Sequence, residues 1–359
     1  MILIINQIYI TTNMMRFVAF SCAAVAAMCL ASCNKNEQAP VIPDRPVKIT
    51  VSVSGPRYSE TKATSVTYSN ESKVNNVQIY VFNNGDLENY ISVDNQKTVE
   101  ISATSGERTI WALVNAPQFS NISTVDQLKA RTSDLADNAV NGFVMAGSAT
   151  QVLADGTDVP VTVRRIVSRI AVQKITPQFT FSRESYVMEI QGIYLINVVG
   201  NATYDGEFIA SGVWYNKLGH VIPEGSSVGE CDDLLFDNPA ATIQNGNPYE
   251  VEHVFYPYPN PTATSGSYPS SWSARRSMLV VEVKILAKGG EGTLPVNAIG
   301  YYPVELPVLE RNKSYIIEEI ILTKNPGSTP YVPLDDDAVT ATISVADWAG
   351  PENLGTQYL

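Results

Sequence analysis

Cys33 has the most specific chemistry of any residue in this chain. It ends the run Leu30-Ala31-Ser32-Cys33, and a polar stretch follows it directly. This pattern is a lipobox, at which a bacterial secretory signal is cut so that the cysteine becomes a lipidated first residue. Arg16 supplies the positive region, and the apolar run Phe17 to Leu30 is too short to span a bilayer. The sequence therefore predicts a signal peptide over 1–32 and a fatty acyl anchor, palmitate included, on Cys33.

A second candidate for chemistry is Gly225-Ser226-Ser227-Val228-Gly229, which fits the G-x-S-x-G pattern of a hydrolase nucleophile. Such an elbow must follow a buried strand and open a helix, whereas this one follows Ile222-Pro223-Glu224. His220 and His253 are the only histidines that could act as a base. The context favours a loop, and we do not expect an enzyme.

Metal, cofactor and nucleic-acid sites are not expected either. Two histidines and Cys231, the one thiol of the mature chain besides Cys33, cannot supply a usual structural zinc site or an internal disulfide. Asp335-Asp336-Asp337 lacks the spaced ligands of a calcium loop and predicts a solvated acidic turn. No glycine loop for phosphate is present. The net charge of −12, without a basic cluster, excludes nucleic acid as an expected partner.

Strand signals dominate the chain after the signal peptide. Val47 to Ser54 alternates apolar and polar residues, which is the period of a half-buried strand with Val47, Ile49, Val51 and Val53 on one face. Asn83-Asn84-Gly85 predicts a tight turn. Further β-rich runs lie at Val77–Phe82, Arg108–Val114, Val159–Ile175, Tyr186–Val199, Ser277–Leu286, Ser314–Leu322 and Ala341–Trp348. The pattern is typical of an all-β chain of antiparallel sandwiches, because parallel strands need a crossover between them.

One helix and one long loop interrupt the strands. Ser123 is the expected cap of a helix that continues to Ala130. The chain from Gly206 to Ser271 is rich in loop residues, and the prolines of Tyr256 to Pro261 are too dense for a central strand. We expect a long surface loop there. Thr176-Pro177-Gln178 is the predicted domain boundary.

A set of motifs runs in order along the chain. They are the lipobox, Thr61-Lys62-Ala63 with Glu71-Ser72-Lys73-Val74, Gly106 to Asn115, Arg164 to Ala171, Leu309 to Tyr315, and the ending Val345-Ala346-Asp347-Trp348. In this order and spacing they resemble the fimbrillin family, the lipoprotein-precursor pilins of type V fimbriae, and major fimbrial subunits of the FimA kind in particular.

The resemblance implies two β-sandwich domains of transthyretin-like type, with few short helices, and maturation by a trypsin-like protease. In such proteins the cut falls after a basic residue that precedes Ala, and Lys62-Ala63 stands at that place. Well-known fimbrillins have Arg there. Lys62 departs from that pattern, so the identity of the protease is left open. Arg57-Tyr58 is the second choice, and Arg45 is followed by Pro46, which such proteases cut poorly.

The expected organisation follows from this cut. The signal peptide over 1–32 includes residues 1–13, which lie before its positive region and indicate that the start codon is assigned too early. A lipidated propeptide with the first strand covers 33–62, an amino-terminal sandwich 63–175, and a carboxyl-terminal sandwich with a donor tail 176–359. Full burial of an apolar side chain of the first strand contributes roughly 1.5 to 3 kcal/mol. Excision of that strand would leave an apolar slot with unpaired backbone groups, which another chain can fill.

The expected donor is the carboxyl-terminal tail of a neighbouring subunit, and head-to-tail insertion yields a filament. Two versions stay open. In one, about 339–359 donates, with Ile343 and Val345 on the apolar face. In the other, Ala341–Trp348 is the last strand of its own domain and only Asn353–Leu359 donates, through Leu354, Tyr358 and Leu359.

The expected function is a surface pilin that serves adhesion. Its expected partners are copies of itself, other fimbrial subunits, the outer membrane through the lipid before cleavage, and a host or bacterial surface ligand. The alternative is a surface lipoprotein that never polymerises and binds a glycan or host ligand through aromatic loop residues, Tyr256 to Tyr268 with Trp272.

Overall fold

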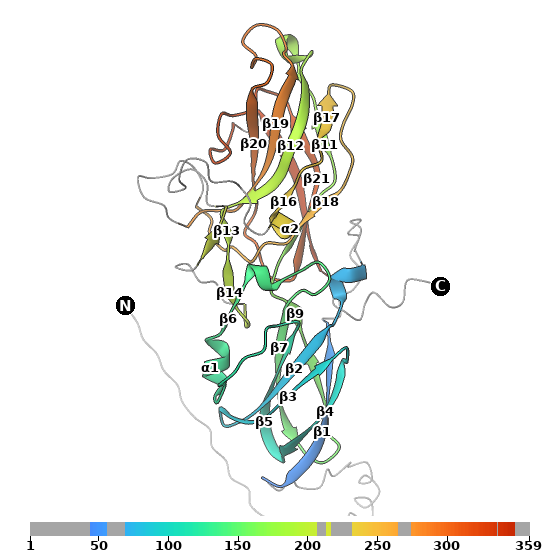
Figure 1. Ribbon diagram of the computed structural model, residues 1–359, viewed down its shortest axis with the longest axis vertical. Coiled ribbons are helices and arrows are strands. Elements are labelled where there is room, and N and C mark those ends of the chain that lie inside the picture. Colours follow the sequence, from blue (N-terminus) through green and yellow to red (C-terminus); the bar gives the residue numbers. More distant parts are fainter. Residues whose placement is uncertain are drawn as a thin grey trace, which may run out of the picture. The chain divides into compact units, whose positions relative to one another are not determined.

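The computed structural model describes residues 44–55, 69–206, 213–216, 232–264, 274–335 and 337–348. Within these ranges the chain forms 22 strands and two short helices, α1 (Val125–Lys129) and α2 (Asp232–Leu235) (Figure 1). Three 3-10 turns are also present, at Ser69–Ser72, Leu135–Asp137 and Phe181–Arg183. The expected all-β fold is confirmed.

Two sheets enclose the core of the amino-terminal part. The first has the order β4 (Thr98–Thr104), β1 (Pro46–Ser54), β8 (Asp158–Thr162). The second has the order β3 (Asp86–Asp94), β2 (Asn76–Asn83), β5 (Gly106–Val114), β7 (Met145–Leu153), β9 (Arg164–Arg165). Apolar side chains of β1, β4 and β8 form one buried cluster with those of β2, β5 and β7. The alternating sequence of β1 therefore faces the second sheet.

The turn between β2 and β3 is the predicted one. Asn84 and Gly85 have φ angles of 50° and 94°, so both residues of the two-residue loop are left-handed. This backbone matches the twist of a hairpin, and Asn-Gly is the pair that adopts it most readily. Gly85 also accepts a hydrogen bond from the first residue of α1, which places the helix against this turn.

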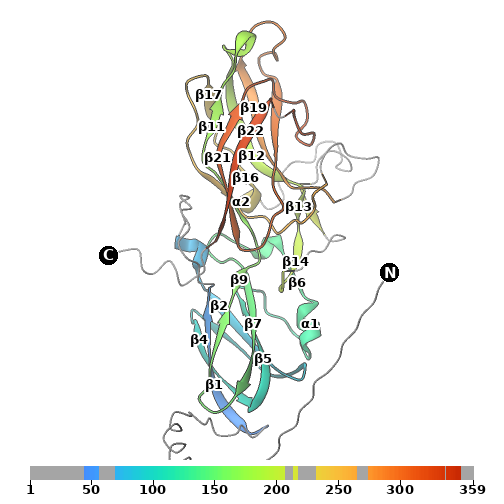
Figure 2. The same cartoon turned by 180° about the vertical axis from the view of Figure 1, so that it is seen from behind.

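Two further sheets form the carboxyl-terminal part. The third sheet has the order β11 (Ile175–Pro177), β21 (Lys313–Leu322), β10 (Arg169–Val172), β18 (His253–Phe255), and β22 (Val339–Asp347) pairs with β21. The fourth has the order β16 (Phe236–Asp237), β12 (Val187–Ile196), β19 (Met278–Ala287), β20 (Ile299–Glu305), and β17 (Ala241–Gln244) pairs with β12. Buried residues of β21, β12 and β19 share one core. Figure 2 shows β22 beside β21.

Two small ladders complete the fold. β13 (Val198–Val199) pairs with β15 (Trp214–Tyr215), and β14 (Asn201–Thr203) pairs with β6 (Thr132–Asp134).

The long strand expected over 159–175 is wrong in detail. The chain forms four short strands there, β8 to β11, and they belong to three sheets. β8 pairs with β1, whereas β10 already pairs with β21. Continuous apolar composition gives no signal where a chain passes from one sheet to another. The domain boundary at 175/176 stays a prediction.

The helix cap also differs from the expectation by one residue. Thr124, not Ser123, is the cap of α1, because its backbone is extended and its side chain accepts a hydrogen bond from the backbone N–H of Gln127. The backbone N–H of Ser123 instead donates to the Gln127 side chain at 2.8 Å.

Candidate functional site at strand β1 and the carboxyl-terminal strand

Strand β1 occupies the middle of the first sheet. It pairs antiparallel with β4 from Pro46 to Ser52 and parallel with β8 from Thr50 to Ser54. Residues 47, 49, 51 and 53 are 9, 1, 0 and 3% exposed. The four apolar residues expected to fill a groove between the sheets thus all lie in the core. A chain without β1 would expose both the β4 and the β8 backbone edges of this groove.

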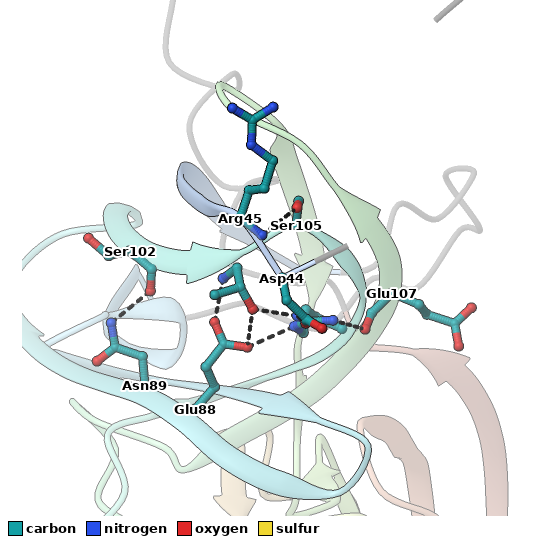
Figure 3. A network of polar contacts seen from close by, with 9 residues as sticks. Asp44, Arg45, Glu88, Asn89, Ser102, Ser105 and Glu107 are labelled. Atoms are coloured by element: carbon teal, nitrogen blue, oxygen red, sulfur yellow. Dashed lines mark hydrogen bonds and ion pairs between the residues drawn. The ribbon is translucent and has the colours of Figure 1, made fainter. Parts of the chain in front are cut away.

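A polar network holds the start of β1 (Figure 3). The backbone of Ser105 exchanges hydrogen bonds with this segment: its carbonyl accepts from the N–H of Asp44 at 2.9 Å, and its N–H donates to the carbonyl of Arg45 at 2.8 Å. The Ser105 hydroxyl accepts from the N–H of Arg45 at 3.0 Å. These bonds extend the β1–β4 ladder by two residues beyond Pro46.

Arg108, on β5, lies at the centre of this network. Its side chain is only 4% exposed, and it pairs with Glu88 at 2.7 Å and with Asp44 at 2.8 Å. Its second terminal nitrogen group donates to the Glu107 carbonyl. The Thr104 hydroxyl accepts from Arg108 and donates to Glu88. The buried Arg108 guanidinium is therefore shared between two carboxylates, that of Glu88 on β3 and that of Asp44 just before β1.

Glu71 forms a second buried polar cluster, which joins the segment after the predicted cleavage site to the end of β22. Its carboxylate accepts hydrogen bonds from Arg169 Nε at 2.9 Å, Tyr256 OH at 2.6 Å and Trp348 Nε1 at 3.1 Å. Arg165 donates to the Glu71 carbonyl, and its guanidinium lies 4.1 Å from the centre of the Trp348 ring. Both arginines are at most 2% exposed.

Electrostatics follows from this geometry. Burial lowers the pKa of the Arg169 guanidinium, but the charge and hydrogen bond of Glu71 outweigh it and the pKa is raised. Burial, and then the neighbouring charge of Glu71, raise the pKa of Tyr256. Glu71 is therefore the counter-ion that a buried Arg169 requires.

Asn312 holds Trp348 from the other side. Its side chain donates to the Trp348 carbonyl at 3.0 Å and accepts from the Arg165 N–H at 3.1 Å, while its own carbonyl accepts from the Trp348 N–H. Its neighbour Arg311 donates to the carbonyls of Ala146, Arg164 and Tyr204. Burial lowers the pKa of Arg311 to about 10. Arg311 and Lys313 line a cavity of about 500 Å³ beside the end of β22.

Strand β22 is held on one side. It pairs antiparallel with β21 over nine positions, with an irregularity between Ile317 and Glu319. None of its residues is fully buried, although Trp348, directly after it, is only 3% exposed. Of the two donor residues predicted here, Ile343 is half-buried against the core and Val345 is 54% exposed. In this structure Ala341–Trp348 therefore extends the sheet of its own chain.

Several predicted site residues lie outside the described residues. They are Cys33, the cleavage pair Lys62-Ala63, the tail residues Leu354, Tyr358 and Leu359, the segment 225–229, and His220, Cys231, Tyr268 and Trp272.

The aromatic surface loop expected from Tyr256 onward is wrong for its first part. Tyr256 and Tyr258 are 2% and 0% exposed, and the Tyr258 hydroxyl donates to Ser133 at 2.8 Å. They anchor the core because buried Glu71 and Ser133 offer acceptors to their hydroxyls. His253 is buried as well, with Asp237 at 2.5 Å and Tyr249 at 2.8 Å from its ring nitrogens.

Sequence reasoning missed the Glu71 cluster and the Arg108 network. The available signal was the presence of Arg165 and Arg169 inside a run of apolar strand residues, since buried arginine is rare without a partner. Across the described ranges, no group of three or more potential ligands is arranged to hold a metal ion. None of the helices described has the length and apolar character needed to cross a bilayer.

Comparison with known proteins finds a family match within the amino-terminal part. Residues 46–173 match the family model of the major fimbrial subunit protein (FimA). The resemblance read from the motifs is thereby confirmed. The FimA match starts at the first residue of β1 and ends just after β10, so it contains the groove strand, Arg108 with Glu88 and Thr104, and both buried arginines.

Solved structures share the fold over a longer range. A fimbrilin (FimA) from Porphyromonas gingivalis is 16% identical, with a TM-score of 0.59 over 85% of this chain and 98% of that one. A candidate cell adhesion protein from Bacteroides eggerthii is 14% identical, with a TM-score of 0.62 over 86% and 98%. These likenesses show the fold alone. The comparison with curated protein sequences finds no match.

Proposed function

We propose that this protein is a structural pilin subunit of a surface fimbrium, exported as a lipoprotein precursor, cleaved by a trypsin-like protease and polymerised by strand exchange to serve adhesion. The observation that carries the proposal is the central place of β1 between β4 and β8, in a segment that matches the FimA family. An edge strand could be lost without opening the core, but a central strand cannot.

The order of the chain supports the cleavage step. β1 ends at Ser54 and the next described element begins at Ser69, and Lys62-Ala63 lies between them. A cut at this bond separates β1 and the lipidated Cys33 from everything that follows. It leaves residue 71, and with it the Glu71 cluster, in the mature subunit.

The difference between β1 and β22 supports exchange. The apolar side chains of β1 are buried and its backbone has partners on both sides, whereas β22 has β21 on one side and a half-exposed apolar face. Moving β22 into a vacated groove would bury more apolar surface, at roughly 25 cal/mol per Å², and would give it two ladders instead of one. Release from β21 breaks the nine-position ladder between the two strands, together with the Lys313–Asp347 and Lys324–Asp337 pairs, which are partly exposed and therefore weak.

Both versions of the donor remain within the proposal. If β22 leaves its sheet, the donor is about 339–359. If it stays, only Asn353–Leu359 donates. In the second case the tail departs just after Trp348, which Asn312 and Glu71 hold in place, whereas in the first case Trp348 leaves with β22.

The test is the amino terminus and the state of the mature protein. Limited trypsin treatment of the precursor should expose Ala63 and yield ladders that resist mild detergent. In an Arg57→Gln background, Lys62→Gln should block both, while Lys73→Gln, an exposed lysine eleven residues on, should change neither. Cys33→Ala should abolish fatty acid labelling. Recovery from cells of a monomer that begins at Cys33 would favour the alternative, a lipoprotein that binds a glycan or host ligand, with Tyr268 and Trp272 as its remaining aromatic candidates.

A further inference from the structure

The Arg108 network indicates how the replacement strand is recognised. This inference rests on the proposed function, because it concerns the segment that enters the groove of a cleaved subunit. Excision of β1 removes Asp44 and leaves Arg108 with Glu88 and Thr104, all of which belong to the mature chain. The Arg108 terminal nitrogen that donated to both Asp44 and Thr104 then keeps the bond to Thr104 and loses the carboxylate. A carboxylate is the natural partner for it, since charge-assisted bonds are the strong ones.

Part of β22 shows the same alternation of apolar and polar residues as β1. Residues 47–53 and residues 339–345 each carry four apolar residues in strict alternation with polar or charged ones, and Ala346 ends the alternation in β22. With the two strands superposed in the same direction, the apolar pairs are Val47 with Val339, Ile49 with Ala341, Val51 with Ile343, and Val53 with Val345.

Flanking aspartates restrict the register of this superposition. Asp337 and Asp347 occupy the next positions of the same parity on either side of the four apolar residues. A slip by two residues would put one of these carboxylates where β1 has Val47 or Val53, which are 9% and 3% exposed. An uncompensated carboxylate at such a position is costly. Only the unslipped register places four apolar side chains in the four buried positions.

The same register brings acidic residues to the Arg108 site. Asp44 lies three residues before Val47, and Asp336 lies three residues before Val339. In the reversed direction, Trp348 would take the place of Asp44. We propose that Arg108 of one subunit, supported by Glu88 and Thr104, binds Asp336 and Asp337, which precede β22 of the next subunit, and thereby fixes the direction and register of the exchanged strand.

Cysteine cross-linking tests direction and register. In β1, Lys48 is opposite Ser102 of β4, and both positions lie on the outer face. Thr340 takes the place of Lys48 in the proposed direction, and Ser344 takes it in the reversed one. Opposite residues of an antiparallel pair are about 4.5 to 5.5 Å apart at Cα, which suits a disulfide. In a Cys231→Ser background, Ser102→Cys with Thr340→Cys should give disulfide-linked ladders after trypsin treatment, and Ser102→Cys with Ser344→Cys should not. Uncleaved precursor should give no disulfide-linked ladders with either pair of cysteines.

A donor peptide tests the role of the charges. A fluorescent peptide of residues 334–348 is added to trypsin-treated precursor, and binding is followed by anisotropy. Asp336→Asn with Asp337→Asn in the peptide should weaken binding about 3- to 10-fold, and less at high salt. Asp335→Asn, one residue further from the strand, is the matched control and should bind like the parent.

Each outcome decides the inference. Ladders linked through Ser344, or equal binding of the parent and the doubly substituted peptide, would overturn it while the proposed function stands. Absence of any polymer from the trypsin-treated parent protein would overturn the proposed function, and the inference with it.

Discussion

Replacement of Glu71 by Gln is expected to destabilise the closed subunit and to loosen the end of β22. The Glu71 side chain is 0% exposed and accepts from Arg169, Tyr256 and Trp348. Gln keeps the size of the side chain, but it removes the counter-ion of Arg169 and replaces one acceptor oxygen by a donor. At least one of the three donors then loses its partner.

The magnitude follows from these contacts. Removal of one partner of a buried ion pair costs about 3 to 5 kcal/mol. Glu252, 16% exposed and 3.5 Å from Arg169, remains as a weaker counter-ion. We therefore expect the free energy of unfolding of the precursor to fall by about 2 to 4 kcal/mol. Glu252→Gln, in the same cluster but closer to solvent, should cost less than about 1 kcal/mol.

The assay is urea denaturation of the precursor, followed by circular dichroism and by tryptophan fluorescence, which reports on the surroundings of Trp348 together with those of the other three tryptophans. After trypsin treatment, Glu71→Gln should also polymerise faster than the parent, because the contact between residue 71 and Trp348, at the end of β22, is weakened. An unfolding free energy equal to that of the parent, or a larger loss for Glu252→Gln than for Glu71→Gln, would refute the reasoning.

Three further changes address other parts of the fold. Val51→Ala should lower the stability of the precursor by about 1 to 3 kcal/mol and speed exchange after cleavage, measured by urea denaturation and ladder formation, whereas Thr50→Ala should leave both unchanged. Gly147→Ala would press a methyl group against the backbone of β8, so its melting temperature should fall, with a cost of about 1 to 3 kcal/mol; an unaltered melting temperature would contradict this packing. A hydrogen bond from Thr176, together with Lys174, lowers the pKa of Glu319 below 4.5, so this contribution to stability is complete above that pH and is lost as the pH falls through the lowered value. Glu319→Gln should therefore flatten the melting curve against pH below about 4.5, and an equal acid sensitivity of both proteins would count against it.

Local patterns in the sequence predicted the parts of the fold that depend on neighbouring residues. The alternation of Val47 to Ser54 identified β1 and its buried face because side-chain direction in a strand has a period of two. Asn84-Gly85 identified its turn because few residues tolerate that backbone. Neither pattern showed that β1 lies in the middle of its sheet, since pairing with β8 joins residues more than 100 positions apart.

The polar clusters could not be predicted for the same reason. Glu71 and Arg169 are 98 positions apart, and Glu71 and Trp348 are 277 apart. Tyr256 read as a loop residue because prolines surround it, yet its hydroxyl reaches a buried carboxylate. The sequence did not show where the chain leaves the sheet of β8 and enters the sheet of β10, because apolar residues fill both cores alike.

The place of β1 between two ladders also has a mechanical consequence. In the proposed filament, a strand that enters such a place from another subunit would be pulled along its own axis when the filament is stretched. Its hydrogen bonds to β4 and β8 lie across that axis, so the load is shared by both ladders at once instead of opening one bond after another. A subunit joined in this way resists tension through backbone geometry, and a surface fibre under flow needs that property at every junction.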